Sequence, residues 1–352
     1  MGFEYDWLVV GDSEGAAHSA SLAARWGARV AWVIPPGETW RRRVCSELAI
    51  AQLQHSSSTV DLAANWRLAE EITENLAILR SPATLALQGV DVRIGSVNFD
   101  CQPHLQVRLR EAQGGQAQGV APTVRLQELR SRRYLLAPAP QAYPPPIQGL
   151  QETPYYDLDH LKPLLSGTLP QRLMIIGSDP QGAVLAQTLA RLGVSVQLLI
   201  AEPLGLPHED PQLGQLLQAH LEAAGVQVLT GTSVTQVRQI EGQIWVLGGS
   251  QALETEVLVL AQGWQGNLQE IGVDKLPIKW YEETTGTSPN LETAQKGIYA
   301  CGSLLGGYCD RELERYEAEV ATYNALVFPR DRLDYSSLPR IISTEPPIAA
   351  VG

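Results

Sequence analysis

Cysteine is scarce in this chain, and its spacing matches no familiar chemistry. The 352 residues include four cysteines, at positions 45, 101, 301 and 309, with no Cys-x-x-Cys pair and no spacing typical of a metal site. The sequence therefore predicts no metal centre. A reduced, cytoplasmic protein without a disulfide framework is the expected class.

Long apolar runs and an excess of basic charge are also missing. No run reaches the ~18 apolar residues that a membrane-spanning helix needs, and the first residues lead directly into a strand-like pattern without a signal peptide. The chain has 26 Lys and Arg against 38 Asp and Glu, which gives a net charge of -12. Because binding to nucleic acid depends on clustered Lys and Arg, nucleic acid is not an expected partner.

A strand–turn–helix–strand pattern occurs twice. In the first unit, apolar residues 5–10 lead through a small-residue turn and an Ala-rich helix to the apolar residues 30–34. Residues 172–200 repeat this plan, and the Pro-rich residues 137–150 between the two units read as a linker. Parallel strands joined by helices predict an α/β fold with two Rossmann-like, doubly wound, three-layer domains.

Each unit has a turn of the kind that receives the pyrophosphate of a dinucleotide. Small residues there allow a tight turn and let a phosphate approach the N-terminus of the next helix. The acidic residue that would bind a ribose at the end of the following strand is replaced by Ile34 and Ile200. The turn positions are Gly11, Ser13, Gly15 and Ala16 in the first unit, and Gly177, Asp179 and Gly182 in the second.

In order along the chain, the sequence resembles the flavin-dependent pyridine nucleotide–disulfide oxidoreductases of the dihydrolipoamide dehydrogenase and mercuric reductase type. The resemblance implies a FAD-binding-like domain in residues 1–150 and 266–337, and an NAD(P)-binding-like domain in residues 151–265. Residues 338–352 resemble the start of a dimerisation domain, which we expect to be truncated. The matching segments are YDWLVVGDSEG (5–15), residues 204–237, residues 253–267, GIYACGSLLGG (297–307) and residues 338–352.

The same resemblance shows where the family's chemistry has changed. GETWRRRVCSELA (37–49) is similar to the family's redox-disulfide helix, in which two Cys lie five positions apart. Trp40 stands at the first of these positions and Cys45 at the second. A redox disulfide needs two sulfurs, so we expect no dithiol–disulfide cycle within this chain. The charged pair that accompanies this helix in the family is also replaced, by Ala49 and Val184.

The resemblance further implies which residues would hold a cofactor. Besides the two turns, these are Thr39, Ala137 of the family's Ala-Thr-Gly segment, and Gly302 and Ser303 of its Gly-Asp segment. FAD is the cofactor that the resemblance implies. NAD(P) is not expected, because Ile200 replaces the ribose-binding acid and the charged pair is absent.

Three functions stay open at this point. The favoured prediction is a divergent FAD-dependent oxidoreductase that transfers electrons at the flavin to a small-molecule or protein redox partner. In it, Cys45 would be the catalytic candidate, titrating near an ordinary thiol pKa of ~8.5. The alternatives are a catalytically silent scaffold or regulatory protein, and an electron-transfer partner whose second Rossmann unit binds another ligand. Cys45 could equally be a buried small hydrophobe, and the oligomeric state is left open.

Overall fold

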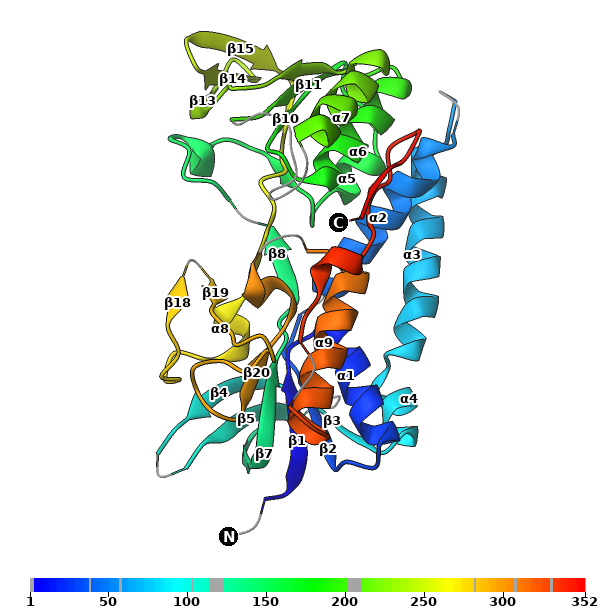
Figure 1. Ribbon diagram of the computed structural model, residues 1–352. Coiled ribbons are helices and arrows are strands. Elements are labelled where there is room, and N and C mark those ends of the chain that lie inside the picture. The colour runs from blue at the N-terminus through cyan, green and yellow to red at the C-terminus, as the bar shows by residue number, and fades with distance from the viewer. Residues whose placement is uncertain are drawn as a thin grey trace. The chain divides into compact units, whose positions relative to one another are not determined.

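The computed structural model describes residues 3–37, 39–56, 59–102, 104–113, 123–142, 144–201, 211–281, 283–306, 309–329 and 332–351 (Figure 1). The chain forms two compact units. Unit 1 contains residues 1–40, 75–141 and 264–335, and unit 2 contains residues 41–74, 142–263 and 336–352. The predicted domain boundaries at 150/151 and 265/266 stay a prediction.

A five-stranded parallel sheet forms the centre of unit 1. Its strand order is β20-β7-β1-β2-β3, and β1 occupies the middle because its last four residues are fully buried apolar side chains. The pairing is in simple register, with Val10 opposite Val33 on one side and Leu136 on the other. The strands are β1 (Tyr5–Val10), β2 (Val30–Ile34), β3 (Val90–Ile94), β7 (Ser131–Leu136) and β20 (Ile298–Ala300).

Helices cover one face of this sheet and a second sheet covers the other, which gives three layers. Alanines of α1 (Glu14–Arg25) and α9 (Arg311–Leu326) pack with Trp7, Val9 and Trp32 in one apolar cluster. On the opposite face, Leu8 and Val10 pack with the antiparallel sheet β4-β5-β6, because successive strand residues point to opposite sides. These strands are β4 (Ser96–Asp100), β5 (Gln106–Gln113) and β6 (Thr123–Leu129).

Short elements complete unit 1. Tyr335 is its last residue and begins the 3-10 turn η3 (Tyr335–Ser337). The others are α4 (Pro82–Leu87), β8 (Pro140–Ala142), β17 (Trp264–Gly266), α8 (Leu268–Ile271), β18 (Trp280–Tyr281), β19 (Thr284–Thr285) and the 3-10 turn η2 (Gly302–Leu305).

Unit 2 repeats the layered plan with a parallel sheet of order β12-β11-β10-β16-β9. Met174 and Ile176 of β10 face the antiparallel sheet β13-β14-β15, while Ile175 faces α6 (Pro180–Arg191). The strands are β9 (Tyr156–Asp157), β10 (Arg172–Ile176), β11 (Ser195–Leu199), β12 (Gln227–Leu229), β13 (Val234–Ile240), β14 (Gln243–Gly248), β15 (Gln251–Thr255) and β16 (Val257–Leu260). The α/β fold with two Rossmann-like units is thereby confirmed.

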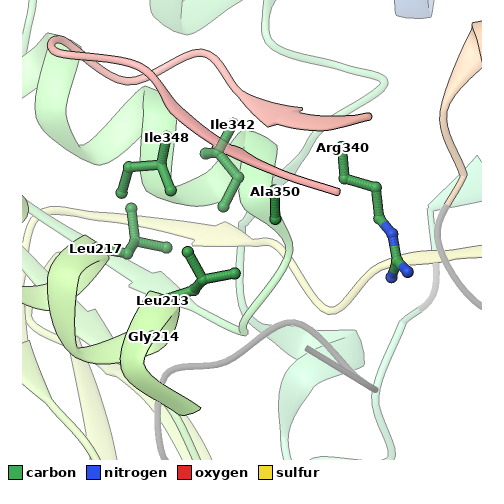
Figure 2. A pocket seen from close by; sticks show the side chains of 7 residues that line it. All are labelled: Leu213, Gly214, Leu217, Arg340, Ile342, Ile348 and Ala350. Carbon is green, nitrogen blue, oxygen red and sulfur yellow. The ribbon is translucent and has the colours of Figure 1, made fainter. Parts of the chain in front are cut away.

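The remaining elements of unit 2 are helical, apart from a terminal hairpin of β21 (Arg340–Ile342) and β22 (Ile348–Ala350). The hairpin and α7 (Pro211–Ala223) line a small apolar groove with Leu213, Leu217, Ile342 and Ile348 (Figure 2). The other helices are α5 (Lys162–Leu165), the 3-10 turn η1 (Leu150–Glu152), and most of α2 (Thr39–Gln54) and α3 (Leu62–Leu79). Among the described helices, none is both long and apolar enough to cross a membrane.

Candidate functional site

The first small-residue turn has the backbone of a dinucleotide-binding turn. Gly11 follows β1 with φ 129°, and a Cβ at this position would lie 2.0 Å from the carbonyl oxygen of Ala137. Only glycine fits such a conformation and such a close approach between strands. The Ser13 amide donates to the same Ala137 oxygen at 3.3 Å. The structure thus brings Gly11, Ser13 and Ala137 together, as the resemblance implied.

The side chain of Ser13 caps helix α1. Its Oγ accepts a hydrogen bond from the Ala16 amide at 3.1 Å, which satisfies one of the amides that a helix N-terminus leaves open. Gly15 lies against α9, where a Cβ would be 2.9 Å from the carbonyl oxygen of Glu314. The glycine is therefore explained by close helix packing. Thr39 begins α2 and is half-buried.

Arg80 lies directly on this turn, although no sequence motif pointed to it. Its Nη2 donates to the Ser13 carbonyl oxygen at 2.6 Å and lies 3.4 Å from Asp12 Oδ1. The guanidinium carbon is 4.1 Å from the centre of the Trp40 ring, within the range of a cation–π contact. Burial lowers the pKa of Arg80, while the nearby Asp12, Glu14 and Glu314 raise it.

Two tryptophans complete the surroundings of the turn. Trp40 Nε1 donates to Glu14 Oε2 at 3.2 Å, and Trp40 is 9% exposed. Trp32 is fully buried in β2 and donates from Nε1 to the Gly11 carbonyl oxygen at 2.8 Å. Trp40 therefore fills volume beside the turn. The contribution of Glu14 was missed, because its partner comes from a different helix.

The second predicted segment of this site, Gly302 and Ser303, lies beside two buried acids of α9. The Gly302 amide donates to Glu317 Oε2 at 2.7 Å, and a Cβ on Gly302 would lie 2.5 Å from Glu314 Oε1. Tyr335 donates its hydroxyl hydrogen to Glu317 Oε1 at 2.9 Å. Burial raises the pKa of Glu317 to about 7. Neither acid could be found from the sequence, since they look like ordinary polar positions of an amphipathic helix.

The residues of unit 1 fit the fold of a FAD site but not the diphosphate of FAD. The chain's own atoms bury Ser13 and Ser303 to 1% and 2% exposure. Ser303 Oγ lies 3.5 Å from the Pro138 carbonyl oxygen, to which it donates. The carboxylate of Glu14 stands at the N-terminus of α1 and that of Glu317 accepts from the Gly302 amide, and like charges repel.

In unit 2, the Cys45 thiol of α2 is buried. Cys45 is a free thiol, 5% exposed, in α2. Burial, with a smaller contribution from Glu70, raises its pKa to about 11, although a hydrogen bond with Thr73 lowers it. The expectation of an ordinary thiol pKa near 8.5 was therefore wrong, because burial disfavours the thiolate.

Two buried apolar residues stand at the positions of the family's charged pair. Ala49 is fully buried and Val184 is nearly so. On the same helix, Arg43 Nε lies 3.0 Å from Glu47 Oε1, and the same oxygen accepts a hydrogen bond from Gln181 Nε2 at 2.6 Å. The sequence did not reveal this arrangement, which links α2 to the start of α6.

The second small-residue turn repeats the geometry of the first. Gly177 has φ 130°, with 2.0 Å between a hypothetical Cβ and the Ala261 carbonyl oxygen. The Asp179 amide donates to that oxygen at 3.0 Å, and Asp179 Oδ1 accepts from the Gln181 amide at 2.8 Å. Gly182 lets α6 approach Ala261, where a Cβ would be 2.4 Å from the alanine Cβ. The turn is a folding element whose cap is a carboxylate.

The described part of the chain contains no candidate metal site. There, no group of three or more His, Cys, Asp or Glu side chains is arranged to hold an ion.

Comparison with known proteins agrees with this architecture. The family model for "Pyridine nucleotide-disulphide oxidoreductase" matches residues 5–322. Mercuric reductase of Acidithiobacillus ferrooxidans is 30% identical over 224 residues, which cover 62% of this chain and 40% of that protein. Mercuric reductase of Staphylococcus aureus is 26% identical over 377 residues, which cover 99% of this chain and 64% of that protein. The chain thus spans less than two thirds of these relatives.

Solved structures show the same fold at lower identity. The HOCl-induced flavoprotein disulfide reductase RclA from Escherichia coli superposes with a TM-score of 0.79 at 20% identity, covering 98% of this chain and 77% of that one. LpdA from Mycobacterium tuberculosis gives a TM-score of 0.82 at 19% identity, covering 99% and 78%.

Proposed function

Because this chain belongs to the pyridine nucleotide-disulphide oxidoreductase family, whose members are FAD-binding flavoproteins, we propose that it is a member without the family's dithiol chemistry that acts as a binding or regulatory scaffold. The resemblance to the family stated from the sequence is confirmed. The observation that supports the proposal is the buried Cys45 thiol, with a tryptophan at the position of its partner sulfur.

Thiol chemistry requires a thiolate, and Cys45 supplies almost none. With a pKa of about 11, roughly one Cys45 side chain in ten thousand is ionised at pH 7. A thiolate of the family type would also need a second sulfur at about 2 Å to form a disulfide. Trp40 provides none, and the charge of Lys162, which lowers the pKa of Cys45, does not reverse the effect of burial. The side chain acts as a small hydrophobe.

The second Rossmann unit has few groups that could bind the pyrophosphate or the ribose of a nicotinamide dinucleotide. The first residue of α6 is Pro180, which has no amide hydrogen, and the Gln181 amide already donates to Asp179. A pyrophosphate at this helix N-terminus would meet the Asp179 carboxylate instead of open amides. Ile200 carries no group for a ribose. These features support the expectation that NAD(P) is not the ligand of this chain.

The competing prediction is electron transfer at bound FAD. A nicotinamide oxidation assay separates it from the scaffold function. The purified protein is mixed with NADH or NADPH, added FAD, and either Hg²⁺ or a small aromatic disulfide as the acceptor. We expect nicotinamide oxidation no faster than with FAD alone. The matched control is Cys45→Ser, which should behave as the parent does. Turnover at enzyme-like rates would refute the scaffold function, whether or not Cys45→Ser abolishes it.

A further inference from the structure

Unit 1 contains three side chains from separate segments that meet on the first small-residue turn: Glu14, Trp40 and Arg80. They are called the internal plug below. We propose that the internal plug closes the position that the diphosphate of FAD takes on this turn, so that unit 1 folds and persists without flavin. The inference goes beyond the loss of thiol chemistry, because it concerns unit 1 alone and is independent of Cys45.

Arg80 is the base of the internal plug. It is largely buried, and its Nη2 bonds the carbonyl oxygen of Ser13, a residue of the turn itself. A diphosphate would need the space over this turn in order to reach the first amides of α1, which have no intrahelical acceptor. The guanidinium is fixed there by Asp12 on one side and by the Trp40 ring on the other.

Trp40 and Glu14 cover Arg80 from the side of α2. The Trp40 indole ring lies on the guanidinium. The indole Nε1 donates a hydrogen bond to Glu14 Oε2 at 3.2 Å. Glu14 is the first residue of α1, where an acidic side chain is favourable because of the helix dipole. The carboxylate therefore supplies the negative charge that a phosphate would bring to this helix N-terminus in a flavoprotein.

The charge balance around the plug opposes a second anion. The carboxylates of Asp12, Glu14 and Glu314 raise the pKa of Arg80, and the cation of Arg311 lowers it. A diphosphate would bring further negative charge close to these carboxylates, in a poorly hydrated place where repulsion is weakly screened.

Two nitrogens of the Arg80 guanidinium could instead donate hydrogen bonds to an anion. Its Nε and Nη1 are buried without a hydrogen-bond acceptor among the described residues. Both nitrogens belong to the guanidinium plane that stacks on Trp40. If phosphate oxygens accept hydrogen bonds from these two nitrogens, the parent protein binds flavin. The internal plug then does not block the turn.

The test is flavin binding by the parent and by the double variant Glu14→Gln/Trp40→Ala. Each protein is incubated with excess FAD and desalted, and the retained flavin absorbance is measured; affinities follow from calorimetric titration with FAD and, separately, ADP. The matched control is Trp26→Ala/Glu319→Gln, which changes the same residue types at exposed positions, Trp26 at the C-terminal end of α1 and Glu319 on α9.

We expect the parent and the control to retain no flavin, and the double variant to bind FAD at least about tenfold more tightly than the parent does. Stoichiometric flavin in the parent would overturn the proposal. Equal, weak binding by a double variant that still melts cooperatively would also overturn it. If the double variant does not fold, the single, nearly isosteric Glu14→Gln decides, since it must bind FAD more tightly than the parent. A flavin-containing parent without thiol turnover would refute the plug and leave the proposed loss of thiol chemistry standing.

Discussion

Replacing Glu317 by Gln should remove a pH-dependent loss of stability from this protein. Glu317 is 3% exposed, and its two oxygens accept hydrogen bonds from the Gly302 amide and the Tyr335 hydroxyl. Burial is the main cause that raises its pKa from 4.5 to about 7, and the charge of Glu314 adds to the effect. Glutamine keeps the shape and one acceptor oxygen, and its amide can donate to the Tyr335 oxygen.

The sign follows from proton binding. A raised pKa means that the folded state binds the proton more tightly than the unfolded state does, so this contribution to the free energy of unfolding falls as pH rises from about 4.5 to about 7. A difference of about 2.5 pKa units corresponds to about 3 kcal/mol. Above pH 7 the parent carries the whole cost of a buried carboxylate. Cys301 and Tyr335 do not titrate in this window, because burial raises the pKa of both.

Urea unfolding at pH 5 and pH 8, followed by circular dichroism, measures the effect. Glu317→Gln should exceed the parent in unfolding free energy by about 2–3 kcal/mol more at pH 8 than at pH 5. Glu319→Gln is the matched control, because Glu319 lies on the same helix with 58% of its side chain exposed. The control should follow the parent. A difference between Glu317→Gln and the parent that is the same at both pH values would refute the assignment of a near-neutral pKa to Glu317.

Three further predictions rest on single contacts. Gly11→Ala should lower the free energy of unfolding by about 3 kcal/mol, since the new Cβ meets the Ala137 carbonyl oxygen at φ 129°; urea titration checks it, and a loss below 1 kcal/mol contradicts it. Asp179→Ala should cost about 1 kcal/mol through the lost helix cap, and Asp179→Asn much less, by the same measurement. Cys45 should resist an aromatic disulfide reagent at pH 7.5 and react after unfolding, with Cys45→Ser identifying its share of the signal; rapid labelling of native Cys45 would contradict its burial.

The turns were predictable because their determinants are local. A glycine directly after a buried strand and before a helix defines a left-handed position within a few residues, and both Gly11 and Gly177 were found in that way. The three-layer architecture followed from the same repeated units. Such signals need no knowledge of distant segments, so sequence spacing alone carries them.

The internal contacts of the site were not predictable, because they join distant parts of the chain. Arg80 meets Ser13 across 67 positions, and Gly302 is bonded by a side chain on a helix that begins nine residues later. The pKa of Cys45 was also missed, since burial depends on what packs around α2. Nothing in the letters of a polar helix distinguishes a buried acid such as Glu317 from an exposed one such as Glu319.

Three backbone amides near the two turns share one physical feature. A nucleotide-binding fold exposes backbone amides to its ligand, and a chain that folds without the ligand must give those amides another acceptor. Here the Ala16 amide bonds Ser13 Oγ at 3.1 Å, the Gln181 amide bonds Asp179 at 2.8 Å, and the Gly302 amide bonds Glu317 at 2.7 Å. Each acceptor is a hydroxyl or carboxylate of the chain itself. Polar residues that look out of place in a cofactor motif thus give buried amides an acceptor from the chain itself, which is the arrangement that the proposed scaffold function requires.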